Sequence, residues 1–174
     1  MELAKQATAL TAVDASAEML ALNRQRVVRS DVRYWQADVF AWTPPERYDV
    51  VFFSAWLSHV PPQRFEAFWD LVADCLNDAG RAFVIDERPS VAAHERVIAN
   101  AAAPAVERQL TTGAQFRTVK VFYEPGELKR RLAELGWEVD IRTVGWRFFY
   151  ATARRAGARQ SSWDTSGEPQ RSAR

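Results

Sequence analysis

The chain has 174 residues, enough for one domain with a hydrophobic core of ordinary size. Hydrophobic residues make up 48% of it and aromatic residues 12%, which indicates a globular protein and excludes an intrinsically disordered one. The 23 Lys and Arg side chains nearly balance the 22 Asp and Glu side chains, so the concentrated basic face of a nucleic-acid-binding protein is not expected.

Cysteine content and hydropathy exclude further classes. Cys75 is the only cysteine, which rules out an internal disulfide and a CxxC metal site. No apolar run approaches the roughly 18 residues of a membrane span, and the first residues lack the pattern of a signal peptide. We therefore expect a cytoplasmic protein that binds no metal, no nucleic acid and no membrane.

The first third of the chain predicts alternating strands and helices. Residues 2–7 are compatible with the last turns of a helix, and the apolar run 10–13 predicts a short buried strand followed by Asp14. Ser16 is a candidate N-cap for the next helix. Residues 31–37 predict a second strand, which ends at Asp38. The nearly continuous apolar segment 48–54 predicts a parallel strand buried on both faces.

The middle of the chain predicts a long amphipathic helix followed by a strand. Pro61 and Pro62 open the helix, and its apolar face comprises Phe65, Phe68, Trp69, Val72, Cys75 and Leu76. We interpret Gly80 as the C-terminal cap of this helix. Residues 81–86 predict a buried strand. Residues 91–110 predict a helix that Pro104 breaks or kinks, and residues 117–123 predict a short strand or an extended link.

The last part predicts a helix and a hairpin. Residues 125–135 form the helix, closed by Gly136, and two strands at 137–143 and 146–153 are joined at Gly145. Strands that alternate with helices predict an α/β fold, with a parallel sheet, helices on both faces and an antiparallel hairpin at the edge. We expect one domain over residues 1–153 and a disordered tail over residues 154–174.

Three segments follow the ends of successive predicted parallel strands. They are VDAS with Asp14, QADVF with Asp38, and FFSAWLSHV at 52–60, of which residues 54–60 lie at the strand end. The carboxyl ends of the strands in an open α/β sheet are where ligands bind. Together with LAELGWEV at 132–139, these segments resemble the class I S-adenosylmethionine-dependent methyltransferases, and in particular the branch that acts on small molecules. The resemblance covers residues 2–153.

The resemblance implies a Rossmann-like fold, S-adenosylmethionine as cofactor, and transfer of a methyl group to a small-molecule acceptor. It also implies cofactor-binding residues, namely Asp14, Ala15, Met19, Asp38, Val39, Ser54, Ala55 and Trp56. Asp14 would bind the ribose, Met19 would pack near the adenine, and Asp38 would accept a hydrogen bond from the adenine amine, with a backbone contact from Val39. The segment 54–56 would lie under the methionine part. Without the family, the two aspartates are equally well explained as helix caps or loop residues.

A base is needed in methyl transfer when the acceptor is a poorly ionised hydroxyl or amine. His59, just past a strand end, is the candidate catalytic base, and its alternative role is to order the turn before Pro61. Asp86 and Glu87 are alternative polar contacts to the acceptor. Residues 88–124 are the candidate lid and specificity region. An apolar acceptor pocket, or else the core, would include Trp56, Tyr123, Trp146, Phe148 and Phe149.

The chain departs from the family in one respect. The family has a glycine-rich loop after its first strand, whereas the first glycine of this sequence is Gly80. We interpret the chain as an N-terminally truncated methyltransferase whose first strand and loop would precede Met1. The alternative is a non-catalytic or degenerate module, in which strands 10–13 and 48–54 pair directly or another chain fills the gap. A short-chain reductase is disfavoured because no tyrosine is followed by lysine four residues later.

Overall fold

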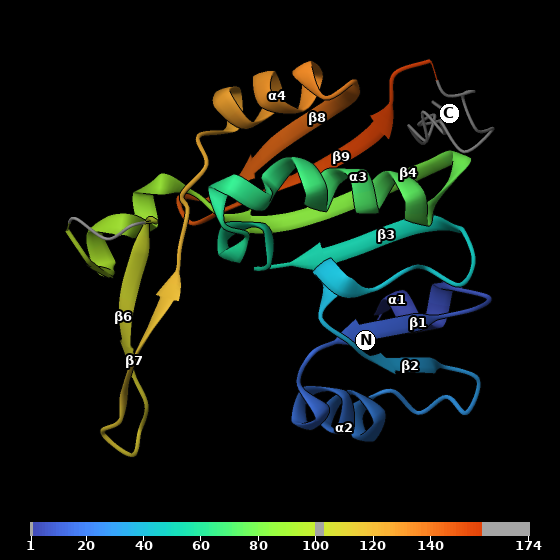
Figure 1. Ribbon diagram of the computed structural model, residues 1–174, viewed down its shortest axis with the longest axis horizontal. Helices are drawn as coiled ribbons and strands as arrows, with labels where there is room; N and C mark the ends of the chain where they lie inside the picture. The colour runs from blue at the N-terminus through green and yellow to red at the C-terminus, as the bar shows by residue number, and fades with distance from the viewer. Residues whose placement is uncertain (1, 100–102, 158–174) are drawn as a thin grey trace, which may run out of the picture. The chain divides into compact units, whose positions relative to one another are not determined.

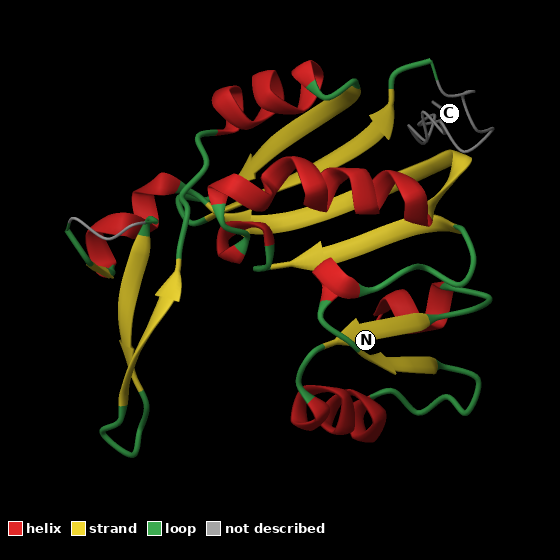
Figure 2. Cartoon of the chain, in the orientation of Figure 1, coloured by secondary structure: helices red, strands yellow, loops and turns green. Residues whose placement is uncertain are grey.

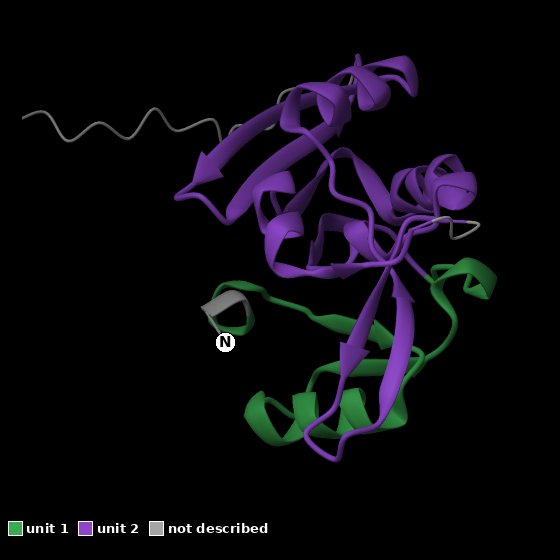
Figure 3. Cartoon of the chain, turned by 90° about the vertical axis from the view of Figure 1, so that its left-hand side faces the viewer, with its two compact units in different colours: residues 1–45 green, residues 46–174 purple. Residues whose placement is uncertain are grey.

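The computed structural model describes residues 2–99 and 103–157 (Figures 1 and 2). The chain divides into two compact units, residues 1–45 and 46–174 (Figure 3). Most of the predicted tail lies outside the described residues, but Arg154 and Arg155 belong to the last strand, so the predicted boundary at 153 falls two residues early. None of the described helices is long and apolar enough to cross a membrane.

The first unit contains two parallel strands and two helices. Its elements are α1 (Glu2–Gln6), β1 (Thr11–Asp14), α2 (Ala17–Arg26), β2 (Arg33–Gln36) and the 3-10 helix η1 (Val39–Ala41). β1 pairs with β2 in parallel, with Asp14 opposite Gln36. The predicted N-cap is confirmed, because Ser16 Oγ accepts a hydrogen bond from the Met19 amide at 3.1 Å. The Arg29 guanidinium donates to the carbonyls of Ala4 and Ala7, each at 2.6 Å, and so satisfies acceptors at the end of α1.

The second unit is built on a four-stranded sheet in the order β3-β4-β9-β8. The strands are β3 (Tyr48–Ser54), β4 (Leu76–Glu87), β8 (Trp137–Val144) and β9 (Phe148–Arg155). β3 and β4 are parallel, and β9 is antiparallel to both of its neighbours. The predicted antiparallel hairpin at the sheet edge is therefore confirmed, and Gly145 occupies its turn with φ of +57°.

The remaining elements of this unit are helices and a small separate sheet. The helices are η2 (Leu57–His59), η3 (Pro62–Arg64), α3 (Phe65–Cys75), η4 (Pro89–His94) and α4 (Pro125–Glu134). The small sheet is antiparallel and consists of β5 (Arg96–Val97), β6 (Ala105–Gln109) and β7 (Gln115–Val119). In Figure 1, β6 and β7 form a long hairpin, which carries residues that the site uses.

The core of the second unit lies on one face of the four-stranded sheet, beneath α3 and α4. The predicted apolar face of α3 is confirmed for five residues, because Phe65, Phe68, Trp69, Val72 and Cys75 are all buried. Leu76, the sixth predicted residue, is buried too but begins β4. Trp69 is 1% exposed, and its ring lies 5.0 Å from that of Trp137 and 5.9 Å from that of Phe53. These edge-to-face contacts join α3 to β3 and β8.

The opposite face of the sheet is open. Its apolar side chains include Val50 at 52% exposure and Phe52 at 40%. The prediction that strand 48–54 is buried on both faces is therefore wrong, because β3 pairs with β4 alone among the described residues and no described helix of this unit covers that face. The strands at 10–13 and 48–54 lie in different units, so the hypothesis that they pair directly stays a prediction.

Gly80 is not the predicted helix cap. It lies inside β4, where the register with β3 is irregular between Tyr48 and Val50. A Cβ atom at this position would approach the carbonyl oxygens of Tyr48 and Asn77 to 3.0 Å. The glycine is therefore required by a close passage of backbone past backbone.

The helix predicted at 91–110 is also wrong. This stretch contains η4, β5 and β6 in the structure, apart from residues 100–102, which lie outside the described residues. The strand pairing starts at Pro104, because its carbonyl accepts a hydrogen bond from the Lys120 amide at 2.9 Å, just before β6 pairs with β7. Val106 is then fully buried, so strand pairing and packing outweigh the helical propensity of the alanines.

Candidate functional site

Asp14 and Asp38 lie at the same edge of the two-stranded sheet of the first unit. Asp14 is the last residue of β1, and Asp38 follows β2 and caps η1. Asp14 Oδ1 accepts from the Ser16 amide at 2.8 Å, and Asp38 Oδ1 accepts from the Phe40 amide at 3.0 Å. Both carboxylates are exposed and, as charged two-oxygen acceptors, have capacity for a ligand beyond these local bonds.

The other predicted cofactor residues of the first unit surround these two aspartates in sequence. Ala15 links Asp14 to the N-cap of α2, and Val39 is the first residue of η1. Met19 lies on the first turn of α2 and is 54% exposed. The unit thus presents two acids and an exposed thioether around one sheet edge.

Ser54 is the last residue of β3 in the second unit, and Ala55 and Trp56 follow it directly. Ala55 has a φ of +50°, a left-handed conformation that a residue with a Cβ seldom adopts. Its amide donates to the Ile85 carbonyl at 2.8 Å, which holds the turn against β4. Trp56 is 38% exposed. Strained backbone of this kind concentrates at functional sites, and here it turns the chain from β3 into η2.

His59 ends η2 and is oriented by the strand β7. Its Nδ1 lies 2.7 Å from the carbonyl oxygen of Val119, so Nδ1 carries the hydrogen and donates it. The other ring nitrogen, Nε2, is then an acceptor. Thr118 Oγ1 lies 3.4 Å from Nδ1 on the same side of the ring. The imidazole is thus held in the tautomer that a general base needs.

Asp86, near the end of β4, binds the backbone of η2. It is 1% exposed at the end of β4, and its carboxylate accepts from the amides of Ser58 at 2.9 Å and Glu87 at 2.8 Å. The predicted contact between Asp86 and the acceptor is not supported, because this side chain is 1% exposed and does not line the hollow described below. It instead fixes the residue that precedes His59.

Glu87 joins two cations that come from distant parts of the chain. Its Oε2 lies 2.8 Å from Lys120 Nζ, and its Oε1 accepts from Arg147 Nε at 3.0 Å and Nη2 at 2.8 Å. Lys120 Nζ also donates to Ser58 Oγ at 3.0 Å. Burial works to raise the pKa of Glu87, but the hydrogen bonds and charges of Lys120 and Arg147 outweigh burial and lower that pKa. The carboxylate is therefore ionised at neutral pH.

These groups line a hollow of about 490 Å³ in the second unit. Its polar side chains include His59, Glu87, Arg108, Lys120 and Arg147. Arg108 also pairs with Glu95 at 2.5 Å. Ala55 lines the hollow as well, so the end of β3 and the base candidate open into one space. A hollow of this volume holds a small molecule.

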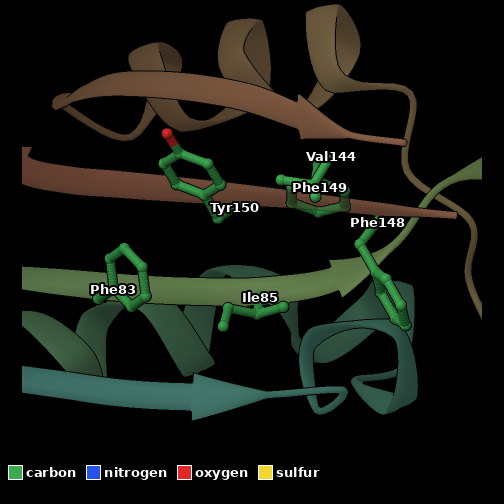
Figure 4. A pocket seen from close by; sticks show the side chains of 6 residues that line it. All are labelled: Phe83, Ile85, Val144, Phe148, Phe149 and Tyr150. Carbon is green, nitrogen blue, oxygen red and sulfur yellow. The ribbon is translucent and has the colours of Figure 1, made fainter. Parts of the chain in front are cut away.

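An apolar hollow of about 280 Å³ lies on the open sheet face, and Phe148 lines both hollows (Figure 4). Phe149 also borders the apolar hollow, but its side chain is fully buried, which fits the core alternative, and an acceptor role for this hollow stays a prediction. Tyr123 is a core residue, 3% exposed and stacked 5.6 Å from Phe65. Trp146 is 56% exposed and packs on His94 at 5.4 Å, away from either hollow.

Sequence reasoning missed the cations of the larger hollow. Arg108 and Lys120 fall in the segment 88–124, which was predicted as a specificity region without named residues, and Arg147 lies next to the hairpin turn. The sequence contains no motif that would place these cations together. Glu87 and Lys120, for example, are 33 positions apart and meet only because β6 and β7 form a hairpin. A lysine within the apolar segment TVKVFY was the available signal, since buried lysines require partners.

Comparisons with known proteins identify the family of the chain. A family model described as a methyltransferase domain matches residues 1–80. A solved DhpI–SAH complex is 39% identical, with a TM-score of 0.74, and the match covers 90% of this chain and 70% of the DhpI chain. The chain belongs to the S-adenosylmethionine-dependent methyltransferases.

Two further structures extend the comparison of this methyltransferase chain. A DhpI–SAM–HEP complex is also 39% identical, with a TM-score of 0.75 and coverage of 88% of this chain and 71% of that one. PH0226 from Pyrococcus horikoshii is 17% identical with a TM-score of 0.72, over 88% of this chain and 74% of that one, which shows the shared fold alone. No match was found among curated proteins. The predicted Rossmann-like α/β methyltransferase fold is confirmed, and S-adenosylmethionine is the cofactor of the family.

Proposed function

We propose that this chain transfers a methyl group from S-adenosylmethionine to a small-molecule acceptor that carries an anionic group. The observation that carries the proposal is the hollow beside η2, where an oriented His59 stands among Arg108, Lys120 and Arg147. Membership of the methyltransferase family supplies the reaction type, and the hollow supplies the chemistry of the acceptor.

The residues of the chain fit the cofactor. Asp14 and Asp38 offer carboxylates to the ribose hydroxyls and the adenine amine, with Ala15, Met19 and Val39 beside them. The segment 54–56 offers the turn with a left-handed Ala55 to the methionine part. When bound, S-adenosylmethionine supplies a methyl group on a sulfonium, and much of the rate of such a displacement comes from positioning.

His59 is the proposed general base. Its Nδ1 hydrogen is engaged by the Val119 carbonyl, so Nε2 is the atom that takes a proton from an acceptor hydroxyl. A base held by a carbonyl in this way keeps one tautomer and one ring orientation. The proposal therefore favours a hydroxyl oxygen as the attacked atom.

The charges of the hollow favour an anionic acceptor. Lys120 has a side chain that is 1% exposed, and its ammonium uses two donors on Glu87 and Ser58. An ammonium has three donors, so it can also bind an occupant. Arg147 is 53% exposed at the mouth of the same hollow. A guanidinium and an ammonium that converge on one space are a common arrangement for binding a carboxylate or a phosphate.

The test measures release of S-adenosylhomocysteine with matched acceptors. Small hydroxy acids and their methyl esters are incubated with the protein and S-adenosylmethionine, and we expect turnover with the acids and at least tenfold less with the esters. His59→Gln should lower turnover roughly 100-fold or more, the usual contribution of a general base. His94→Gln is the matched control, because His94 packs on Trp146 outside the hollow, and it should keep full activity. Equal turnover of acids and esters, or an active His59→Gln variant, would refute the proposal.

A non-catalytic module is the second candidate. One observation favours it: the first glycine of the sequence is Gly80, so this sequence contains no glycine-rich loop before the strand at 48–54. Such a module would release no S-adenosylhomocysteine with any acceptor and would not bind the cofactor product.

A further inference from the structure

We propose that Lys120 is a positioning residue for the base: through Ser58 it holds η2 so that the His59 ring keeps its hydrogen bond to the strand β7. The inference rests on the proposed function, because it concerns which ring nitrogen of His59 is free to accept a proton. It is tested on the imidazole itself and needs no turnover.

η2 is too short to fix the orientation of His59 by itself. It comprises three residues, and no side chain caps its N-terminus. The His59 amide donates to the Trp56 carbonyl at 2.8 Å, and the Val60 amide donates to the Leu57 carbonyl at 3.1 Å. The hydrogen-bond geometry of a 3-10 turn is poorer than that of an α-helix. Contacts from other elements must therefore determine where η2 presents the imidazole.

Those contacts converge on Ser58, whose three polar groups all bind other elements. Its amide donates to the Asp86 carboxylate at 2.9 Å. Its carbonyl accepts from the Val121 amide at 2.7 Å, and its hydroxyl oxygen accepts from Lys120 Nζ at 3.0 Å. Ser58 is 1% exposed, so loss of one of these partners would not be made good by water.

Residues 119–121 form the matching side of this contact. The Val119 carbonyl oxygen lies 2.7 Å from His59 Nδ1, and the next two residues are those that bind Ser58. Two consecutive residues of η2 thus face three consecutive residues of one segment, which sets the backbone and the ring in a single register. Thr118 Oγ1 lies 3.4 Å from Nδ1, beyond the usual length of such a bond, and does not replace Val119.

Lys120 supplies the side-chain part of this contact and is itself firmly held. Its amide donates to the Pro104 carbonyl at 2.9 Å, which attaches its backbone to the start of β6. Its side chain is 1% exposed, and Nζ lies 2.8 Å from Glu87 Oε2 at the end of β4. A buried ammonium that moved away from such partners would leave unpaired charges behind. Lys120 therefore joins the hairpin, the end of β4 and η2 at one point.

The test is the tautomer of His59, read from the ¹⁵N chemical shifts of its ring nitrogens at mildly alkaline pH, where an imidazole is neutral. All chains carry His94→Gln, so that His59 is the single histidine. With no other change, the ring hydrogen should be on Nδ1. Ser58→Ala removes the hydroxyl that accepts from Lys120, and Lys120→Met removes the ammonium. In both variants we expect the bond to Val119 to be lost and the form with the hydrogen on Nε2 to become the main one.

A lysine that only stabilised the fold would lower Tm on removal and leave the tautomer unchanged. Lys129→Met is the matched control, because Lys129 is exposed on α4, and a change of tautomer there would overturn the inference. It is also overturned if the parent chain lacks the hydrogen on Nδ1, or if Ser58→Ala or a folded Lys120→Met keeps it there. If Lys120→Met does not fold, Ser58→Ala alone decides.

The inference and the proposed function fail separately. If the tautomer changes as expected in a chain that shows no methyl transfer, the inference stands and the proposed function fails. If the chain methylates an acceptor but Ser58→Ala keeps the original tautomer, the proposed function stands and the inference fails.

Discussion

Replacement of Asp86 by alanine tests how η2, and with it His59, is held in place. In the native chain the Asp86 carboxylate accepts from two backbone amides, those of Ser58 at 2.9 Å and Glu87 at 2.8 Å. The Asp86→Ala change leaves both donors without this acceptor in a region where Ser58 and Asp86 are each 1% exposed. A buried donor without a partner costs about 1–3 kcal/mol, so the two together predict a loss of about 2–6 kcal/mol in the free energy of unfolding.

The assay is urea unfolding followed by tryptophan fluorescence, because Trp69 and Trp137 are buried in the same unit and report its unfolding. Asp86→Asn retains one acceptor oxygen and should lose about half as much free energy as the alanine variant. The control is Asp140→Ala, which removes an exposed pair with Arg142 and should change stability by less than about 1 kcal/mol. If Asp86→Ala is within 1 kcal/mol of the wild type, the claim that this carboxylate organises η2 is wrong.

Three further predictions follow from single positions. Burial raises the pKa of the Cys75 thiol to about 11, so native protein at pH 8 should react with iodoacetamide far more slowly than unfolded protein, and equal labelling rates would contradict its burial. Gly80→Ala should lower the urea midpoint, because its Cβ would lie 3.0 Å from two carbonyl oxygens, whereas Gly126→Ala, with nothing within 4 Å, should not. Lys120 and Arg147 lower the pKa of Glu87 against the effect of burial. Its contribution to stability is therefore complete above its unfolded pKa of about 4.3 and is lost as the pH falls through the lower folded pKa. Urea midpoints measured from pH 6 to pH 3 should fall more steeply for the wild type than for Glu87→Gln, and parallel curves would contradict this.

The sequence predicted those features of the fold that local patterns determine. The apolar face of α3, the Ser16 cap, the Gly136 helix end and the final hairpin each depend on residues close together in the chain. The elements predicted wrongly depend on distant partners. Gly80 looked like a helix cap because it follows a helical pattern, but its position is set by the Tyr48 carbonyl on a neighbouring strand.

The residues of the candidate site likewise fall into those that local sequence patterns predict and those that depend on distant partners. The positions of Asp14 and Asp38 in the first unit, and of the turn after β3 in the second, could be predicted, because each follows the end of a strand that the local sequence pattern indicates. The cations of the hollow could not, because Lys120 reaches Glu87 only after β6 and β7 fold into a hairpin. That hairpin was hidden by an alanine-rich segment that resembles a helix in isolation.

The most direct test of the account is thermal unfolding of the 174-residue chain with and without S-adenosylhomocysteine. A ligand present at 100 times its dissociation constant stabilises the folded state by about 2.7 kcal/mol, which corresponds to a rise of about 5–10 °C in Tm for a chain of this size. We expect this rise for the wild type and its loss in Asp14→Asn and Asp38→Asn. A Tm that does not change with ligand would contradict cofactor binding by this chain and would favour the non-catalytic module.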